Sequence, residues 1–130
     1  MATTTAAVTL TSDLLSDALS VSASTTCMKA GTTADGLDQM EYGVVEIATG
    51  TAYDIICSTP TASKASKLYI KNHSTDETYY VSVVLDAQAV GRLYGGDWML
   101  IPYSGGNGED IEYTASDTTE TTLEYCVFYE

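Results

Sequence analysis

Short runs of residues that suit β-strands, separated by polar or glycine-rich turns, follow one another along most of the chain. Thr, Val, Ile and Tyr fit a pleated, half-buried surface, and the chain contains ten Tyr but only two Pro and one Phe. The turns recur about every 8 to 14 residues, which is typical of a sandwich. We therefore expect an all-β fold: a single antiparallel β-sandwich, jelly-roll-like, with about eight strands.

The C-terminal part of the chain predicts a β-hairpin. Apolar and polar side chains alternate from Leu123 to Glu130, as in a strand with one buried face. Alternation also marks Ile111 to Ala115, and the polar stretch SDTTET lies between the two runs. Residues 110–129 therefore predict two paired strands, of which the long last one leaves an edge only partly guarded.

Further strand-like runs lie upstream. Lys67 to Lys71 and Tyr79 to Leu85 predict a second strand pair, with a turn between them. The apolar stretch from Arg92 to Tyr103 is interrupted by Gly95-Gly96, which indicates a bulge or a corner. Earlier strands are predicted over Leu19 to Lys29, Glu41 to Ala48 and Tyr53 to Cys57.

The beginning of the chain has no clear periodicity. Residues 1–7, MATTTAA, predict a flexible N-terminal arm ahead of a single sandwich domain over residues 8–130. The segment from Thr11 to Ser20 predicts a short helical turn or a loop between strands, because isolated helices shorter than about 12 residues are marginal.

The charge of the chain excludes several classes of partner. At 130 residues the chain has the length of one domain, and its 18 acidic and 5 basic residues give a formal charge of −13. Such a chain repels phosphate backbones and anionic lipids, so we expect neither nucleic acid nor a membrane as partner. No apolar run is long enough to span a bilayer, and the first residues lack the pattern of a secretory signal.

Residues that could carry chemistry are few and scattered. The single histidine, His73, falls in a predicted turn without a metal-ligand neighbour. Cys27, Cys57 and Cys126 lie in strand-like runs, where unpaired cysteines usually act as small core residues, and their odd number suggests free thiols made in a reducing compartment. We therefore predict no enzyme, no cofactor and no metal.

Two remaining features each have two interpretations. Glu109, Asp110 and Glu112 predict a solvated acidic hairpin edge that blocks aggregation, with weak binding of a hard cation as the alternative. Trp98, the sole tryptophan, is expected in the core behind the Gly95-Gly96 corner, with an anchor at a protein interface as the alternative.

The C-terminal half resembles small structural proteins of tailed bacteriophages. The matching elements are the strand LYIKN at Leu68–Asn72, a β-branched strand within Tyr79–Leu85, the pattern G-L--GD----P over Gly91–Pro102, an acidic strand at Asp110–Tyr113 and a final strand at Glu124–Glu130. The chain is most similar to capsid decoration, or cement, proteins of phages that infect cyanobacteria. The resemblance implies a non-enzymatic protein of the virion, made in the host cytoplasm, that docks on the major capsid protein or another virion protein.

A polar surface rich in Thr, Ser and Tyr, together with a free arm, suits repeated docking onto a lattice, where many weak copies act by avidity. The alternatives are a phage tail, neck or fibre component, or a carbohydrate-binding β-sandwich module. We expect a homo-oligomer, a trimer before a dimer. The residues predicted to bind the partner are Thr3, Thr4, Thr5, Val8 and Trp98.

Overall fold

A computed structural model of the chain describes residues 3–14, 19–32, 34–48, 52–55, 64–85, 87–102, 111–115 and 121–130. Within these ranges the regular structure consists of strands alone, as predicted, and no helix there could cross a membrane. The strands described are β1 (Thr5–Ser12), β2 (Leu19–Thr26), β3 (Gln39–Ile47), β4 (Ala52–Ile55), β5 (Ser66–Asn72), β6 (Tyr80–Leu85), β7 (Gln88–Tyr94), β8 (Trp98–Pro102), β9 (Ile111–Ala115) and β10 (Thr121–Tyr129).

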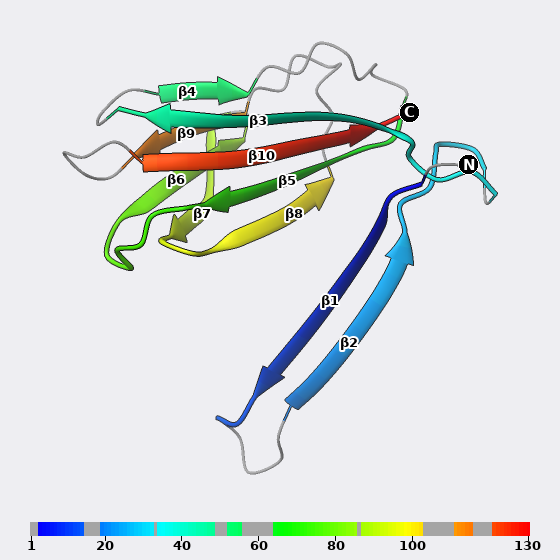
Figure 1. Ribbon diagram of the computed structural model, residues 1–130, viewed down its shortest axis with the longest axis horizontal. Helices are drawn as coiled ribbons and strands as arrows, with labels where there is room; N and C mark the ends of the chain where they lie inside the picture. Colours follow the sequence, from blue (N-terminus) through cyan, green and yellow to red (C-terminus); the bar gives the residue numbers. More distant parts are fainter. Residues whose placement is uncertain are drawn as a thin grey trace.

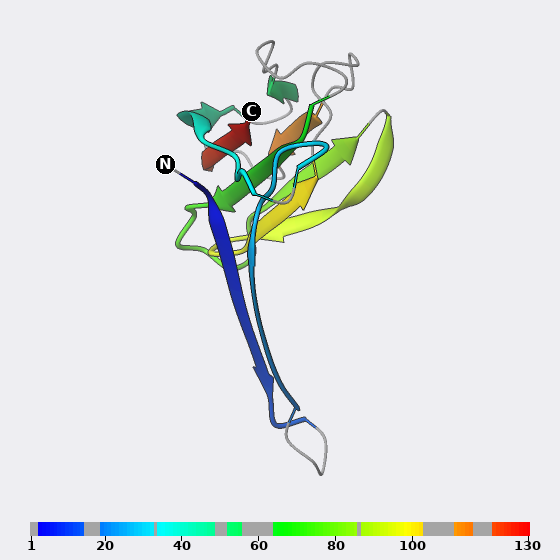
Figure 2. The same cartoon turned by 90° about the vertical axis from the view of Figure 1, so that its right-hand side faces the viewer.

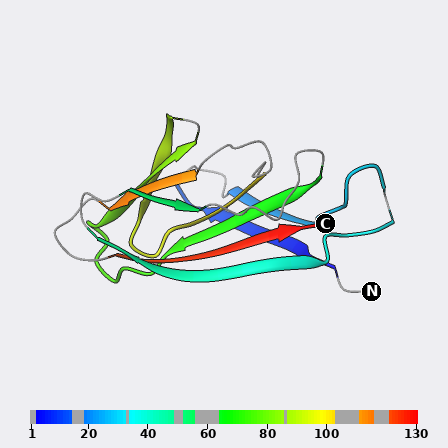
Figure 3. The same ribbon diagram turned by 90° about the horizontal axis from the view of Figure 1, so that it is seen from above.

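Strands β3 to β10 form two four-stranded antiparallel sheets, in the orders β3-β10-β5-β8 and β4-β9-β6-β7 (Figures 1 and 3). This order follows from folding the chain in half, because β3 pairs with β10, β4 with β9, β5 with β8, and β6 with β7. The antiparallel strand pairs made in this way then curl round one another, so that β10 also pairs with β5, and β9 with β6. The topology is that of a jelly roll, which confirms the predicted class of sandwich.

The two sheets pack through the side chains on one face of each strand. Along β5, fully buried residues such as Leu68 and Ile70 alternate with half-buried ones. Val83 and Tyr113 face them from the other sheet and are also buried. Each strand can bury only one of its two faces in this way, since successive side chains point in opposite directions. The buried core consists of Ile47, Leu68, Ile70, Val81, Val83, Leu93, Tyr113, Ala115, Leu123 and Val127.

Both predicted pairings of neighbouring strands are wrong. The hairpin over residues 110–129 does not form, because β9 pairs with β4 and β6 while β10 lies in the other sheet between β3 and β5. Residues 67–71 and 79–85 likewise belong to different sheets. In a jelly roll the connection between such neighbours crosses from one sheet to the other. Alternation correctly indicates the buried faces of β5, β9 and β10, but it says nothing about the partner of a strand.

The position of β10 also corrects the predicted edge. The long C-terminal strand is interior, and the edges of the sandwich are β3, β8, β4 and β7. Glu112 lies on β9, which is interior as well, so at this residue the acidic run does not guard an edge. Glu109 and Asp110 lie outside the described residues.

The predicted corner at Gly95-Gly96 is confirmed as a turn between β7 and β8. Gly96 has a φ of 88°, a left-handed conformation that favours glycine. The buried side chain of Asn72 donates from Nδ2 to the carbonyl of Leu93 at 3.0 Å, and its backbone bonds to both Gly96 and Asp97 at 3.0 Å. These bonds fix the register of β8 against the end of β5.

Strands β1 and β2 form a separate two-stranded sheet that leads away from the sandwich (Figures 1 and 2). We call this hairpin, Thr5–Ser12 with Leu19–Thr26, the arm. Residues 5–7 of the predicted flexible arm pair with β2, so the first strand begins at Thr5 and not at Val8. The hairpin lies outside the two sheets of the sandwich that was predicted over residues 8–130. The predicted turn or loop over Thr11 to Ser20 is replaced by strand at both ends, while residues 1–2 and 15–18 lie outside the described residues.

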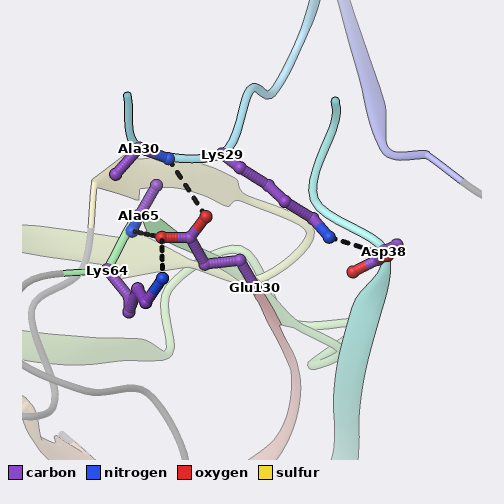
Figure 4. A network of polar contacts seen from close by, with 6 residues as sticks. All are labelled: Lys29, Ala30, Asp38, Lys64, Ala65 and Glu130. Atoms are coloured by element: carbon purple, nitrogen blue, oxygen red, sulfur yellow. Dashed lines mark hydrogen bonds and ion pairs between the residues drawn. The ribbon is translucent and has the colours of Figure 1, made fainter. Parts of the chain in front are cut away.

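Glu130 joins the base of the arm to the sandwich (Figure 4). Its carboxylate accepts hydrogen bonds from the backbone N–H of Ala30, at 3.1 Å, and of Ala65, at 3.2 Å, and Lys64 lies 3.7 Å away. The side chain is only 5% exposed. Ala30 follows β2 and Ala65 precedes β5, so one carboxylate connects the arm to a central strand of the sandwich.

A surface ion pair and two backbone bonds complete this junction. Cys27 N–H donates to the carbonyl of Thr4 at 2.9 Å, and the buried Leu37 donates to that of Cys27 at 2.7 Å. Lys29 Nζ lies 2.9 Å from Asp38 Oδ2, and this hydrogen bond lowers the pKa of Asp38 and raises that of Lys29. The stability from the pair is therefore lost as pH falls through the lowered pKa of Asp38, or as it rises through the raised pKa of Lys29.

We predict that Glu130→Ala loosens the junction and lowers the free energy of unfolding by about 1–3 kcal/mol, because two backbone donors lose their acceptor. Hydrogen exchange should become faster at Ala30 and Ala65, and urea unfolding should give the change in stability. Glu130→Gln keeps one acceptor oxygen, so its free energy of unfolding should lie between those of the wild type and Glu130→Ala. Glu46→Ala, at an exposed position of β3, serves as the control. Unchanged exchange at both amides in Glu130→Ala would contradict this role.

Candidate docking surface

The arm has one apolar face and one polar face. In the register of the hairpin, Val8 lies opposite Ala23 and Leu10 opposite Val21, while Thr9 lies opposite Ser22. Residues directly opposite in an antiparallel pair point to the same side, so the two sides of the hairpin differ in chemistry. The apolar face of the arm contains Ala6, Val8, Leu10, Leu19, Val21 and Ala23, with Thr25 and Ser12 at its two ends.

This apolar face is open to solvent. Leu10 is 56% exposed and Val21 is 48% exposed, and Val8 and Leu19 are exposed to a similar degree. Neither strand of the arm contains an ionisable side chain. A hairpin with an exposed apolar face and no charge is unusual on so acidic a protein, and such surfaces mark sites of interaction.

A second apolar surface covers the outside of the β3-β10-β5-β8 sheet, on the side turned away from the core. Its central row runs across the strands from Tyr42 through Cys126 and Tyr69 to Leu100, which are opposite one another in the register. We call this surface the outer face; its apolar and aromatic members are Met40, Tyr42, Val44, Tyr69, Trp98, Leu100, Cys126 and Phe128.

The outer face is neutral at its centre near pH 7. Desolvation, and after it the negative charge of Glu124, raise the pKa of Tyr42, Tyr69 and Cys126, so these groups stay protonated. Glu124 itself lies opposite Lys71 on β5, and its carboxylate is 2.6 Å from Nε2 of His73. Glu124 is thus close to two groups that can carry a positive charge.

A groove of about 420 Å³ lies where the base of the arm meets the outer face. Four of the five residues predicted to bind a partner line it: Thr4, Thr5 and Val8 from the arm, and Trp98 from the sheet. The remaining one, Thr3, is exposed and lies just before the arm. From the sheet, Tyr69, Lys71, Leu100 and Phe128 also line the groove.

The prediction that Trp98 lies in the core is wrong, because its side chain is 50% exposed. Trp98 lies opposite Lys71 on the outer face, and its ring is 6.3 Å from that of Tyr69. The space behind the corner is taken by Asn72 and its hydrogen bonds, which hold β8 in the register that turns Trp98 outward.

The residues considered for chemistry remain apart. His73 is exposed in a turn, as predicted. Cys27 is buried and fits the role of a small core residue, whereas Cys126 is half-buried on the outer face, and both are free thiols. Cys57 lies outside the described residues. Among the residues that the structure describes, no three His, Cys, Asp or Glu side chains are grouped so as to hold a metal ion.

Sequence reasoning missed the part of the outer face that β3 contributes. Met40, Tyr42 and Val44 are all more than half exposed, while the opposite side of β3 supplies Val45 and Ile47 to the core. The signal was present in the sequence, since Met40, Tyr42 and Val44 form an apolar alternating set opposite the one that contains Val45 and Ile47. A strand whose outward side chains are apolar presents a second face that another layer or another molecule can cover.

Comparison with protein-family models, with curated proteins and with solved structures finds no match for this chain. The role of the docking surface is therefore inferred from its own side chains.

We predict that Trp98→Ala folds normally, with a loss of about 0.5–1.5 kcal/mol for the contact with Tyr69 rather than the roughly 3–5 kcal/mol typical of a buried tryptophan. Urea unfolding followed by far-UV circular dichroism measures the difference. In the wild type, acrylamide should quench the fluorescence of this sole tryptophan at low protein concentration. A protected, blue-shifted emission at that concentration would contradict the exposure of Trp98.

We further predict slow alkylation of Cys126 at neutral pH, because burial and then the charge of Glu124 raise the pKa of its thiol. Peptide-resolved mass spectrometry after treatment with iodoacetamide separates Cys126 from the other two cysteines. Glu124→Gln removes the nearby charge and should increase the rate at a fixed pH. Glu46→Gln, farther along the same sheet, should leave it unchanged. Equal rates in the two variants would exclude an influence of Glu124.

Proposed function

We propose that this protein is a non-enzymatic structural protein of a virion: a capsid decoration, or cement, protein that docks on the major capsid shell and stabilises it. The observation that carries the proposal is the docking surface, in which an uncharged apolar arm and an apolar outer face come together at one groove. Wide apolar surfaces on a small acidic protein suit contact with other proteins. Jelly rolls occur in viral capsid domains, which supports the proposal by analogy of fold alone.

The proposal includes a homo-oligomer, with a trimer preferred to a dimer. Decoration of an icosahedral or hexagonal lattice places proteins at local three-fold points, and a trimer presents several arms from one particle. The arm then contacts the shell or a neighbouring copy. Many weak contacts of this kind add up through avidity. Assembly with the shell follows synthesis in the host cytoplasm.

Carbohydrate binding is a second candidate function because of one observation. Trp98 and Tyr69 lie side by side on the outer face, with interplanar angle 34° and with Lys71 beside them in the groove. Exposed aromatic rings on a sandwich can stack on the apolar faces of sugars. A component of a phage tail, neck or fibre remains the structural alternative, since it would need a docking surface of the same kind.

The proposal predicts that the protein sediments with capsid shells assembled from the major capsid protein of the same genome. Val8→Glu and Trp98→Ala should weaken this binding about tenfold or more, because each change removes an apolar side chain from the groove. Thr9→Glu adds the same charge as Val8→Glu on the polar face of the arm and should bind like the wild type.

Failure of the wild-type protein to sediment with shells would overturn the decoration function. Binding to purified tails under the same conditions would then favour the tail alternative. Micromolar binding to a glycan, lost in Trp98→Ala, would favour the carbohydrate-binding module.

A further inference from the structure

We infer that the apolar face of the arm of one copy packs on the outer face of the β3-β10-β5-β8 sheet of a second copy. This arm exchange rests on the homo-oligomer included in the proposed function and names the surfaces that would join its copies, but it requires no docking on a capsid. It begins from the arm itself, which has only two strands and no covering layer in the described part of one chain. An isolated two-stranded hairpin is marginally stable in water, so its apolar face needs a partner surface.

The arm of the same chain does not cover the whole outer face. Its base reaches the groove beside Tyr69, Trp98 and Leu100, while Met40 and Tyr42 on β3 stay exposed. The bond between Cys27 and Thr4 holds the base of the hairpin, and from there the two strands lead away from the sandwich (Figures 1 and 2). The apolar face of the arm and the exposed part of the outer face therefore meet only between copies.

The two faces match in chemistry and in size. Both present aliphatic or aromatic side chains at their centre, and apolar faces of sheets pack on one another about 10 Å apart. The eight-residue strands of the arm span about 27 Å, and the nine-residue strand β10 about 30 Å. The arm can thus lie along the outer face over most of its length.

Charge favours a second copy as the occupant, although the chain carries a formal charge of −13. Two such molecules repel each other wherever acidic surfaces approach. The strands of the arm bring no charge. The outer face carries Lys67 and Lys71, two of only five basic residues in the chain, against Glu46 and Glu124, so its charges balance. The arm and the outer face are therefore the surfaces through which two copies approach at the least electrostatic cost.

The area of contact indicates a closed assembly. A two-stranded face about 27 Å long and about 10 Å wide buries roughly 270 Å² on each surface, or roughly 540 Å² per contact. A stable interface needs about 1,000 Å² in total. One contact falls short, whereas reciprocal exchange in a dimer places two contacts, roughly 1,080 Å², in one interface. In a cyclic trimer each copy takes part in two contacts with its neighbours, which together also bury roughly 1,080 Å². An assembly in which each copy both gives and receives an arm satisfies the requirement.

Sedimentation velocity of the purified protein, from low to high micromolar concentration, tests the exchange with two matched pairs of variants. Leu10→Glu and Tyr42→Glu each place a charge on an exposed apolar position, one on the arm and one on the outer face. Thr9→Glu and Gln39→Glu add the same charge at exposed neighbouring positions. The wild type and the two controls should associate alike, and Leu10→Glu and Tyr42→Glu should associate about tenfold or more weakly.

The other outcomes overturn the inference in distinguishable ways. A wild type that stays monomeric excludes the exchange, whatever the result with capsids. Association of Tyr42→Glu at the wild-type level would mean that arms pack on arms. Association of Leu10→Glu at that level would mean that outer faces pack on each other.

A cysteine pair tests the contact directly. Isotopically labelled Leu10→Cys, Cys126→Ser protein is mixed with the unlabelled wild type under mild oxidation. Mass spectrometry should find a disulfide between labelled Cys at position 10 and unlabelled Cys126, which can form only between copies. Thr9→Cys in place of Leu10→Cys should give at least about tenfold less of this product. Equal yields would contradict packing through the apolar face of the arm.

Discussion

The packing of two sheets through one face of each strand is the constraint on which the rest of this structure depends. Successive side chains of a strand point to opposite sides, so a two-layer sandwich shields only half of them. In the β4-β9-β6-β7 sheet and its partner, the shielded half forms the core around Leu68, Val83 and Tyr113. In the β3-β10-β5-β8 sheet the side chains that point away from the core are also largely apolar. A two-layer sandwich leaves these side chains outside its core. The outer face is the direct result.

The junction at Glu130 makes the outer face and the arm parts of one surface. A hairpin tied only by its own two strands could take many directions relative to the sandwich. Here the carboxylate of Glu130 bonds to Ala30 on the arm side and to Ala65 at the entry to β5. Asn72 acts in a similar way at the other end of β5, where it fixes the corner that turns Trp98 outward. Both are polar groups that hold apolar surfaces in place.

The sequence predicts the strands of this protein much better than their partners. Alternation locates β5 and β10 within a few residues and indicates their buried sides, because the period of two depends only on local geometry, and a run of β-forming residues locates β3. The partner of a strand depends on the topology of the whole chain. For this reason β9 and β10 belong to different sheets although they are neighbours in the sequence.

The docking surface was predictable in part, for a related reason. Thr4 and Thr5 belong to the predicted flexible arm, Val8 begins the predicted domain and Trp98 is the lone tryptophan. The structure places all four at one groove. The exposure of Trp98 was not predictable, since it depends on a register that Asn72 sets through bonds to residues more than 20 positions away. The Thr and Ala residues near the start of the chain do not predict a strand by themselves. Their strand forms by pairing with β2, whose polar and apolar residues alternate in the matching register.

In the assembly that we propose, the length of the arm gives the acidity of the protein a role. At physiological ionic strength charges are screened beyond about 8 Å, while the strands of the arm span about 27 Å. An uncharged arm of this length extends past the region where two acidic sandwiches repel each other strongly. Repulsion between the bodies then disfavours random association, and the arm allows contact only where an apolar face of matching size is available. Net charge and arm together thus select for ordered docking over aggregation.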